Sequence, residues 1–106
     1  MQFDVYADAS GSYRWRLLDG NGQNVASSGE SFASQSNATR AAEGFKAGAK
    51  TYTYEIYEDA GGNYRWRAKA GNGEKVASSG ESFSSRSNAT SAADNVRDNA
   101  GSATGP

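Results

Sequence analysis

The sequence predicts an α+β fold in which two β-β-β-α repeats share one mainly antiparallel sheet, with two helices on one face and pseudo-two-fold symmetry. Three observations predict it. The tetrapeptide YRWR at residues 13–16 recurs at residues 64–67, and the residues around both copies align without a gap. Within each copy, a strand-like alternation of apolar and polar residues gives way to a helical period. One copy alone buries too little surface for a stable core, so the two copies should share one.

The two copies define the domain organisation, with repeats at residues 1–50 and 51–100. Only residues 49–51 separate the end of the first copy from the strand-like run that opens the second. A connection this short does not let the halves move independently, so we expect a single domain over residues 1–100. Residues 101–106 are mostly small and polar, and they are predicted to form a disordered tail.

The composition excludes several kinds of chemistry. The 106 residues include no Cys and no His, which rules out disulfides, thiolate nucleophiles, Ser-His relays and ordinary zinc sites. We therefore expect no cofactor and no metal. A net charge of -1 is unlike the strongly basic balance of a dedicated nucleic-acid-binding domain, and it gives no attraction to an anionic membrane.

Hydropathy and the first residues bear on the location of the protein. No apolar run approaches the roughly 20 residues that a membrane-spanning helix needs. The residues that follow Met1 lack the basic and apolar segments of a signal peptide. We therefore expect a cytoplasmic protein that makes no membrane contact.

The first two strands are predicted at residues 3–8 and 13–17, where apolar and polar residues alternate. The segment between them fits a three-residue hairpin loop, with Gly11 at the last position, where a left-handed backbone is needed. This loop sets a register that places Val5 opposite Trp15 on the apolar face. A slip by one residue would move every apolar side chain to the other face, so the register is well specified.

The opposite face of the same hairpin is polar. The register places Asp4 opposite Arg16 and Tyr6 opposite Arg14. Cross-strand pairs of this kind stabilise a sheet by about 0.2–1 kcal/mol each. The second copy repeats them as Glu55 opposite Arg67 and Tyr57 opposite Arg65.

A third strand is expected at about residues 24–28, after a turn at residues 20–22. Either a two-residue Asn-Gly turn or a three-residue loop fits this segment. The two alternatives differ in whether Val25 or Ala26 faces inward, and the sequence leaves both open.

A helix closes each repeat. Apolar residues recur at the i, i+3, i+4, i+7 spacing of one helical face, which in the two copies comprises Ala38, Ala41, Ala42, Phe45, Ala89, Ala92, Ala93 and Val96. In the first copy, Ser34 or Ser36 fits the N-cap and Gly48 fits a left-handed C-cap. The equivalent residues of the second copy are Ser85, Ser87 and Asn99.

The same order of motifs occurs twice: a strand, YRWR, an Asn-Gly turn, ASS followed by an aromatic residue, and an Ala-rich helix. In these motifs the chain resembles the YegP-like family of small prokaryotic proteins, over roughly residues 2–100. The resemblance implies a β-β-β-α unit that pairs with a second unit, in tandem or as a homodimer, around a shared sheet with helices on one face. It implies no activity, because the family is uncharacterised. Members often carry a basic residue at the helix start, where this chain has Gln35 and Arg86.

The candidate ligand-binding residues are polar and aromatic side chains of the first two strands in each copy. If helices cover the tryptophan face, these residues line the open face of the sheet, and they are Tyr6, Arg14, Arg16, Tyr57, Arg65, Arg67 and Lys69. Arginines interleaved with aromatic residues could stack on bases or grip phosphate, as open sheets do in RNA-binding modules. The alternative, favoured by the near-neutral net charge, is that each Arg is answered by a cross-strand partner, Asp4 or Glu55, or by stacking on a Tyr ring. Lys69 replaces Leu18 of the first copy and makes the second copy's face slightly more basic.

Residues 27–32 recur unchanged as residues 78–83, in a region predicted to be irregular. Repetition in a loop is a stronger sign of function than repetition in a core. The favoured interpretation is nevertheless structural: the Ser side chains satisfy backbone groups of the loop, and Glu30 caps a group nearby.

These observations favour an uncharacterised, non-enzymatic accessory module that acts through association with a protein partner. The chain itself is expected to be a monomer with an internal pseudo-dimer. The alternative is weak binding of nucleic acid or another anionic ligand through the Arg and Tyr side chains of the open sheet. An enzyme that relies on carboxylates such as Glu30 and Glu81 is disfavoured, because no two carboxylates are spaced as a general acid and base.

Overall fold

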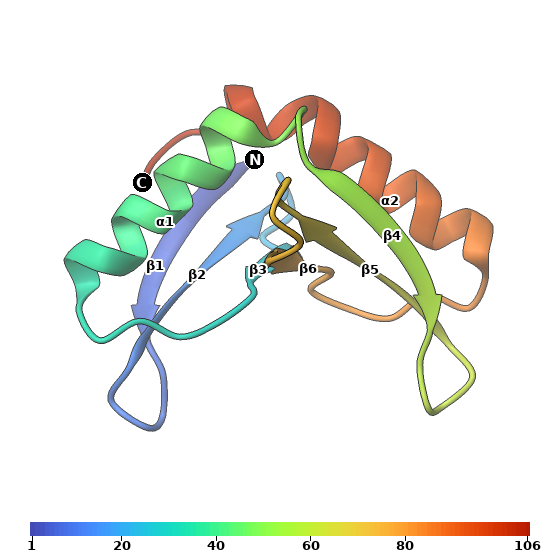
Figure 1. Cartoon of the computed structure of the whole chain (residues 1–106), viewed down its shortest axis with the longest axis horizontal. Helices are drawn as coiled ribbons and strands as arrows, with labels where there is room; N and C mark the ends of the chain where they lie inside the picture. The colour runs from blue at the N-terminus through green and yellow to red at the C-terminus, as the bar shows by residue number, and fades with distance from the viewer.

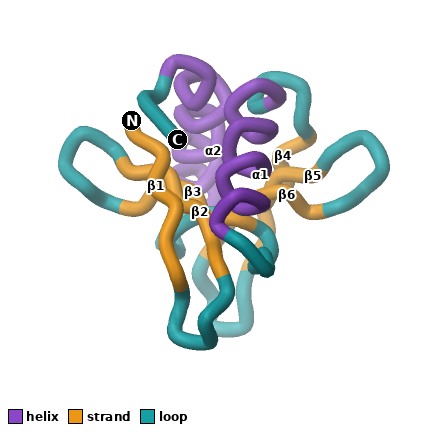
Figure 2. The backbone as a smooth tube through the Cα atoms, turned by 90° about the vertical axis from the view of Figure 1, so that its left-hand side faces the viewer, coloured by secondary structure: helices purple, strands orange, loops and turns teal.

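The computed structural model describes all 106 residues, which form one six-stranded antiparallel sheet with two α-helices on one side of it (Figures 1 and 2). The first repeat supplies β1 (Gln2–Ala7), β2 (Tyr13–Leu18), β3 (Asn24–Ser28) and α1 (Gln35–Gly48). The second repeat supplies β4 (Thr53–Glu58), β5 (Tyr64–Lys69), β6 (Lys75–Ser78) and α2 (Arg86–Asn99). The predicted fold class, two β-β-β-α repeats that share one sheet, is confirmed.

The strand order is β1-β2-β3-β6-β5-β4, so the repeats meet where β3 lies beside β6. At this seam Ser27 pairs with Ser78 and Ser28 pairs with Ala77. Because Ser27 and Ser78 occupy equivalent positions in the two repeats, the pseudo-two-fold axis passes through their pair. The sequence did not specify this order, since nothing in one repeat states which strand faces the other.

The hairpin register predicted from loop chemistry is confirmed, with Val5 opposite Trp15 and Asp4 opposite Arg16. The turn that the sequence left open is a three-residue loop: the Asp19 N–H donates to the Gln23 carbonyl, and Gly22 has a positive φ of 79°. The third strand then turns Ala26 into the core, where it is fully buried.

The core lies between the sheet and the two helices. Its largest fully buried side chains are Trp15, Leu17, Phe45, Trp66 and Val96. Alanines on the inner face of each helix let the helix axis approach the sheet closely, so that the Phe45 ring lies 5.0 Å from the Trp15 ring between centroids. Both tryptophans therefore belong to the core and not to the open face of the sheet.

The helix starts follow the prediction and the helix ends do not. The Ser34 hydroxyl accepts a hydrogen bond from the Asn37 N–H at 3.1 Å, and Ser85 caps α2 in the same way. The predicted left-handed C-caps are wrong, because α1 ends through Ala49 and α2 through Ala100, both in the right-handed conformation. Gly48 instead leaves room for Tyr52: a Cβ at position 48 would lie 2.8 Å from the Tyr52 hydroxyl, so a larger residue there would require the Tyr52 side chain to move. Neither helix has the length and apolar character to cross a membrane.

The predicted disorder of residues 101–106 is also wrong. A short 3-10 helix, η1 (Ala100–Ser102), follows α2, and Ala103 then packs into the core with 5% of its surface exposed. Thr104 pairs with the start of β1, accepting a hydrogen bond from the Phe3 N–H at 2.9 Å and donating one to the Met1 carbonyl at 3.0 Å. The outer edge of β1 offers unpaired backbone groups, and the tail satisfies some of them.

Candidate functional site

The face of the sheet turned away from the helices carries the candidate residues named from the sequence. The strand alternation that buries Trp15 and Trp66 turns their neighbours outward on β2 and β5. We call this surface the arginine–tyrosine face, and it comprises Tyr6, Arg14, Arg16, Tyr57, Arg65, Arg67 and Lys69.

The centre of each half of this face is an Arg held between a carboxylate and an aromatic ring. Arg16 donates to the Asp4 carboxylate at 2.9 Å, and its guanidinium lies 4.5 Å from the centre of the Tyr6 ring. Arg67 repeats the arrangement in the second repeat, with Glu55 at 2.8 Å and the Tyr57 ring at 4.7 Å. Both guanidinium groups are thus fixed from two sides, and the two Arg side chains are still 39% exposed.

The outer Arg of each half is paired with a residue that the sequence analysis did not assign to it. Arg14 was expected to find its partner in Tyr6, directly opposite on β1. Its Nε instead donates to the Asp8 carboxylate at 3.1 Å, and Arg65 contacts Asp59 at the same distance. The missed signal is that a carboxylate at the start of the hairpin loop lies diagonally next to the Arg position.

The extra cation of the second repeat is also compensated. Lys69 lies 3.3 Å from the Glu55 carboxylate, which it shares with Arg67. The five cations of the arginine–tyrosine face therefore meet four carboxylates, and none of the five lacks an ion-pair partner. The alternative in which each Arg is answered by Asp4, Glu55 or a Tyr ring is confirmed for Arg16 and Arg67, whereas Arg14 and Arg65 are answered by carboxylates of the hairpin loops.

Two of these carboxylates are held ionised by hydrogen bonds. The Ser10 hydroxyl has the largest effect on Asp8, and together with the Ser10 backbone N–H and Arg14 it lowers the pKa of that carboxyl below its usual 3.8. The hydrogen bond from Arg67 lowers the pKa of Glu55 below its usual 4.5. These groups stay charged under all but strongly acidic conditions.

The pKa of Asp59 is also lowered, although the contributions to the shift differ in order from those at Asp8. Partial desolvation is the largest single influence on it and raises its pKa, but hydrogen bonds from the Asn63 N–H, Arg65 and the Gly61 N–H together outweigh it. The net effect is a pKa below 3.8.

These shifts give an acid-sensitive contribution to stability. Because the folded-state pKa of Asp8 and Asp59 lies below the unfolded value of 3.8, their stabilisation is complete above that value and is lost as the pH falls through the folded values. The Asp8→Asn/Asp59→Asn variant should therefore lose stability less steeply than wild type below pH 3.8. Urea midpoints measured against pH check this, with Glu43→Gln on α1 as the control. Parallel curves for the double variant and wild type would contradict it.

The repeated loop after β3 has a structural role. The Ser28 hydroxyl is buried, accepts from the Trp15 N–H at 3.4 Å and donates to the Glu30 carbonyl at 2.8 Å. The Ser79 hydroxyl likewise accepts a hydrogen bond from the Trp66 N–H. The expectation that serines satisfy loop backbone groups is confirmed, whereas the Glu30 carboxylate caps nothing and is exposed.

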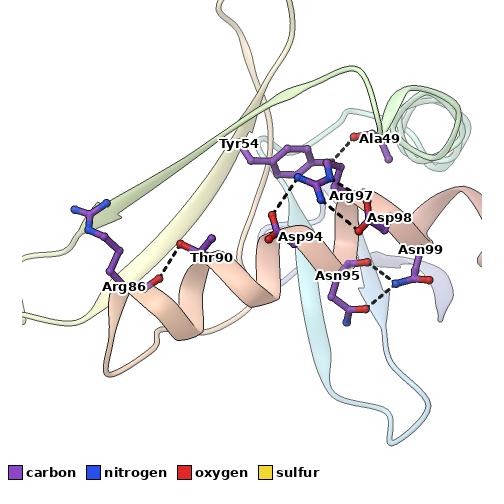
Figure 3. Close-up of polar contacts among 9 residues, drawn as sticks. All are labelled: Ala49, Tyr54, Arg86, Thr90, Asp94, Asn95, Arg97, Asp98 and Asn99. Atoms are coloured by element: carbon purple, nitrogen blue, oxygen red, sulfur yellow. Dashed lines mark hydrogen bonds and ion pairs between the residues drawn. The ribbon is translucent and has the colours of Figure 1, made fainter.

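A second polar cluster, on α2, was not singled out from the sequence (Figure 3). Arg97 bridges Asp94 at 3.1 Å and Asp98 at 2.9 Å. Beside it the Tyr54 hydroxyl donates to the Ala49 carbonyl at 2.7 Å, and burial raises the pKa of this Tyr. The contact fastens the second repeat to the end of α1, so the cluster serves the fold.

Arg86, the basic residue at the start of α2, points to the edge of the sheet. Its Nη1 donates to the Ile56 carbonyl on β4 at 3.4 Å, and its guanidinium lies 5.5 Å from the Tyr64 ring. No group of three or more His, Cys, Asp or Glu side chains is placed to hold a metal ion.

The geometry defines a class of protein: an internally duplicated β-β-β-α protein with a charge-compensated open sheet. The family model described as "Domain of unknown function (DUF1508)" matches residues 8–54 and again residues 59–104. The chain therefore belongs to the DUF1508 family, in which it carries two copies of the domain, and the family has no assigned function.

Known proteins agree with this assignment. A UPF0339 protein of Neisseria meningitidis serogroup B is 51% identical over 41 residues, which are 39% of this chain and 71% of that protein. A UPF0339 protein of Treponema denticola is 45% identical over 47 residues, 44% of this chain and 79% of that protein. Both relatives are thus close to one repeat in length.

Two solved structures share the complete fold. The solution structure of yegP from E. coli, a protein of unknown function, has a TM-score of 0.80 at 21% identity, over 97% of this chain and 88% of that one. UPF0339 protein SO3888 from Shewanella oneidensis has a TM-score of 0.78 at 18% identity, over 94% and 84% of the two chains. At these identities the likeness concerns the fold alone, and it confirms the YegP-like architecture.

Proposed function

We propose that this chain is a non-enzymatic module that associates with a protein partner through the arginine–tyrosine face. The observation that carries the proposal is the contact set of Arg16 and Arg67. Each guanidinium is fixed by a carboxylate and stacked on a Tyr ring, and yet each remains partly exposed. Arg and Tyr are enriched at protein interfaces and at their energetic hot spots.

Rigidity favours this use of the surface. A side chain that is already held in place loses little conformational entropy when a partner covers it. The alternating charges of Arg16, Asp4 and Arg14 also offer both donors and acceptors, as the polar rim of a protein interface requires. A partner of mixed polarity therefore suits the face better than a polyanion does.

Charge compensation counts against the alternative, binding of nucleic acid or another anion. A phosphate that approached Arg16 or Arg67 would have to compete with the carboxylate already bound there. The stacked Arg and Tyr side chains are the one feature that favours it, because bases stack on such platforms. Association with protein is therefore the first proposal and anion binding the second.

The internal duplication supports a role that needs no chemistry. A relative of one-repeat length that folds as one repeat of this chain does would supply three strands and one helix, and would need a second copy to complete the sheet seen here. Fusion of two repeats supplies that second copy within one chain, so we propose that the protein is a monomer. Within this proposal it acts in the cytoplasm, which fractionation of cells that carry the tagged chain would test.

Photo-crosslinking in cells that express the chain naturally tests the main proposal. A benzophenone amino acid at position 57 should form adducts with one defined set of proteins, and the same group at position 43 on α1 should not. The purified partner should bind the Arg16→Ala/Arg67→Ala variant at least about tenfold more weakly than wild type. Adducts with nucleic acid in place of protein, or identical adducts from both positions, would overturn the proposal in favour of the alternative or of no site at this face.

A further inference from the structure

The structure has a hollow of about 550 Å³ beside α1, on the helix-covered side of the sheet and away from the arginine–tyrosine face. Its walls come from both repeats: the first supplies Trp15, Phe32 and Phe45, and the second supplies Tyr52, just before β4, and Val76, on β6. This volume falls within the range of about 300–1,000 Å³ that small-molecule sites occupy, and such sites are mostly apolar with a few polar groups. We call it the aromatic pocket.

The aromatic pocket exists because α1 lacks a side chain at Gly44. A Cβ at this position would meet no atom within 4 Å, so the helix leaves open space there. Tyr52 forms a fixed wall next to it: its ring stacks on Phe45 with centroids 5.6 Å apart, and its hydroxyl donates to the Gly44 carbonyl at 3.2 Å. The opening is therefore bounded by ordered aromatic groups.

The second repeat shows that the duplicated fold does not require this pocket. The position equivalent to Gly44 is Asn95, and those equivalent to Tyr52 and Phe45 are Ala103 and Val96. No hollow is present at the corresponding place beside α2. There the indole nitrogen of Trp66 is sealed from solvent without a hydrogen-bond partner. The pocket thus depends on positions at which the repeats differ, namely 44, 45 and 52.

The rim of the aromatic pocket carries unpaired charge. Glu30, Glu74 and Lys75 line it, and none of the three takes part in an ion pair, unlike every cation of the arginine–tyrosine face. The two carboxylates outnumber the single ammonium group. At the corresponding place beside α2, the positions equivalent to Glu74 and Lys75 belong to the first repeat and hold the neutral residues Gln23 and Asn24.

We propose that the aromatic pocket binds a small aromatic molecule that carries a primary ammonium group. The ring lies against Phe32, Phe45 and Tyr52, and the ammonium group reaches Glu30 and Glu74 at the rim. Carboxylates and electron-rich rings both favour a cation at this place. The aromatic pocket shares no residue with the arginine–tyrosine face, so failure of one proposal leaves the other unaffected.

Tryptamine and indole-3-acetate are the probes for this site, because they share a ring and differ in the sign of their charge. Each is titrated into the full, isotope-labelled chain while NMR follows the indole N–H signals of Trp15 and Trp66. Tryptamine should shift the Trp15 signal saturably and leave the Trp66 signal in place, and indole-3-acetate should bind at least about tenfold more weakly. No saturable shift of Trp15, equal shifts of both signals, or equal affinity for the two probes would overturn the proposal.

Two variants sharpen the test. Gly44→Leu fills the aromatic pocket with a side chain that also favours a helix more than glycine does, and it should weaken tryptamine binding at least about tenfold. Asn95→Leu, the matched change in the second repeat, should leave binding unchanged. Glu30→Gln/Glu74→Gln should remove the preference for tryptamine over indole-3-acetate. If Gly44→Leu binds as wild type does, or if the charge variant keeps the preference, the site is not in this pocket.

Discussion

Replacement of Trp66 by alanine is expected to lower the free energy of unfolding by about 3–5 kcal/mol, the usual loss for a large aromatic residue truncated in a core. The Trp66 side chain is fully buried between β5 and α2, and its ring lies 5.7 Å from that of Tyr54. A domain of this size has a total stability of about 5–15 kcal/mol, so the variant should be close to unfolding. Urea unfolding followed by far-UV circular dichroism measures the loss.

Two further substitutions control for this result. Trp66→Phe keeps most of the buried surface and should cost clearly less than the alanine variant. Tyr57→Ala removes an aromatic residue from the open face of the neighbouring strand and should cost about 1 kcal/mol or less. Equal losses for Trp66→Ala and Tyr57→Ala would contradict the assignment of the tryptophans to the core.

Introduction of a methyl group at Gly80 should open the seam between the repeats. A Cβ at Gly80 would overlap the carbonyl oxygen of Asn24, a backbone atom that cannot turn aside. At Gly29, the equivalent residue, the Cβ would lie 2.8 Å from the Lys75 carbonyl oxygen. Gly80→Ala is therefore expected to cost about 1–3 kcal/mol, near the upper end of the range for overpacking, and Gly29→Ala less.

The control for these variants is Gly44→Ala. The same methyl group enters open space there, in the interior of a helix, and should stabilise the protein by up to about 1 kcal/mol. Thermal unfolding of the three variants gives the comparison. If Gly80→Ala unfolds at the same temperature as wild type, the close approach of the two repeats at this glycine does not limit stability.

The hairpins were predictable because several local signals agree on them. Gly11 requires one loop conformation, and that loop brings apolar residues such as Val5 and Trp15 together while it sets Asp4 against Arg16. No other register satisfies all three demands. The helix starts were predictable for a similar reason, because a serine such as Ser34 satisfies backbone N–H groups of its own chain segment.

Features that depend on contact between distant segments were not predictable. The pairing of β3 with β6 follows from how two whole repeats fit together. The tail is ordered because Thr104 forms hydrogen bonds with backbone groups at the start of β1. At position 48, a side chain would crowd the nearby Tyr52 hydroxyl. Local composition contains none of this information.

Part of the candidate site was within reach of the sequence. The arginine–tyrosine face follows directly from the hairpin register, although the pairing of Arg14 with Asp8 depends on the twist of the hairpin. The aromatic pocket does not follow from the positions at which the two repeats agree. The signal for it was present in two positions that disagree, Gly44 against Asn95 and Tyr52 against Ala103.

The bonds from Thr104 to Met1 and Phe3 have a consequence for the chain as a whole. They bring Thr104 beside Gln2, whose counterpart in the second repeat, Thr53, is joined directly to the end of the first repeat. The peptide chain joins the end of α1 to β4, and hydrogen bonds hold the segment after α2 against β1 at the equivalent place. Each helix is therefore followed by a segment that leads to the first strand of the other repeat, once through a covalent link and once through hydrogen bonds alone.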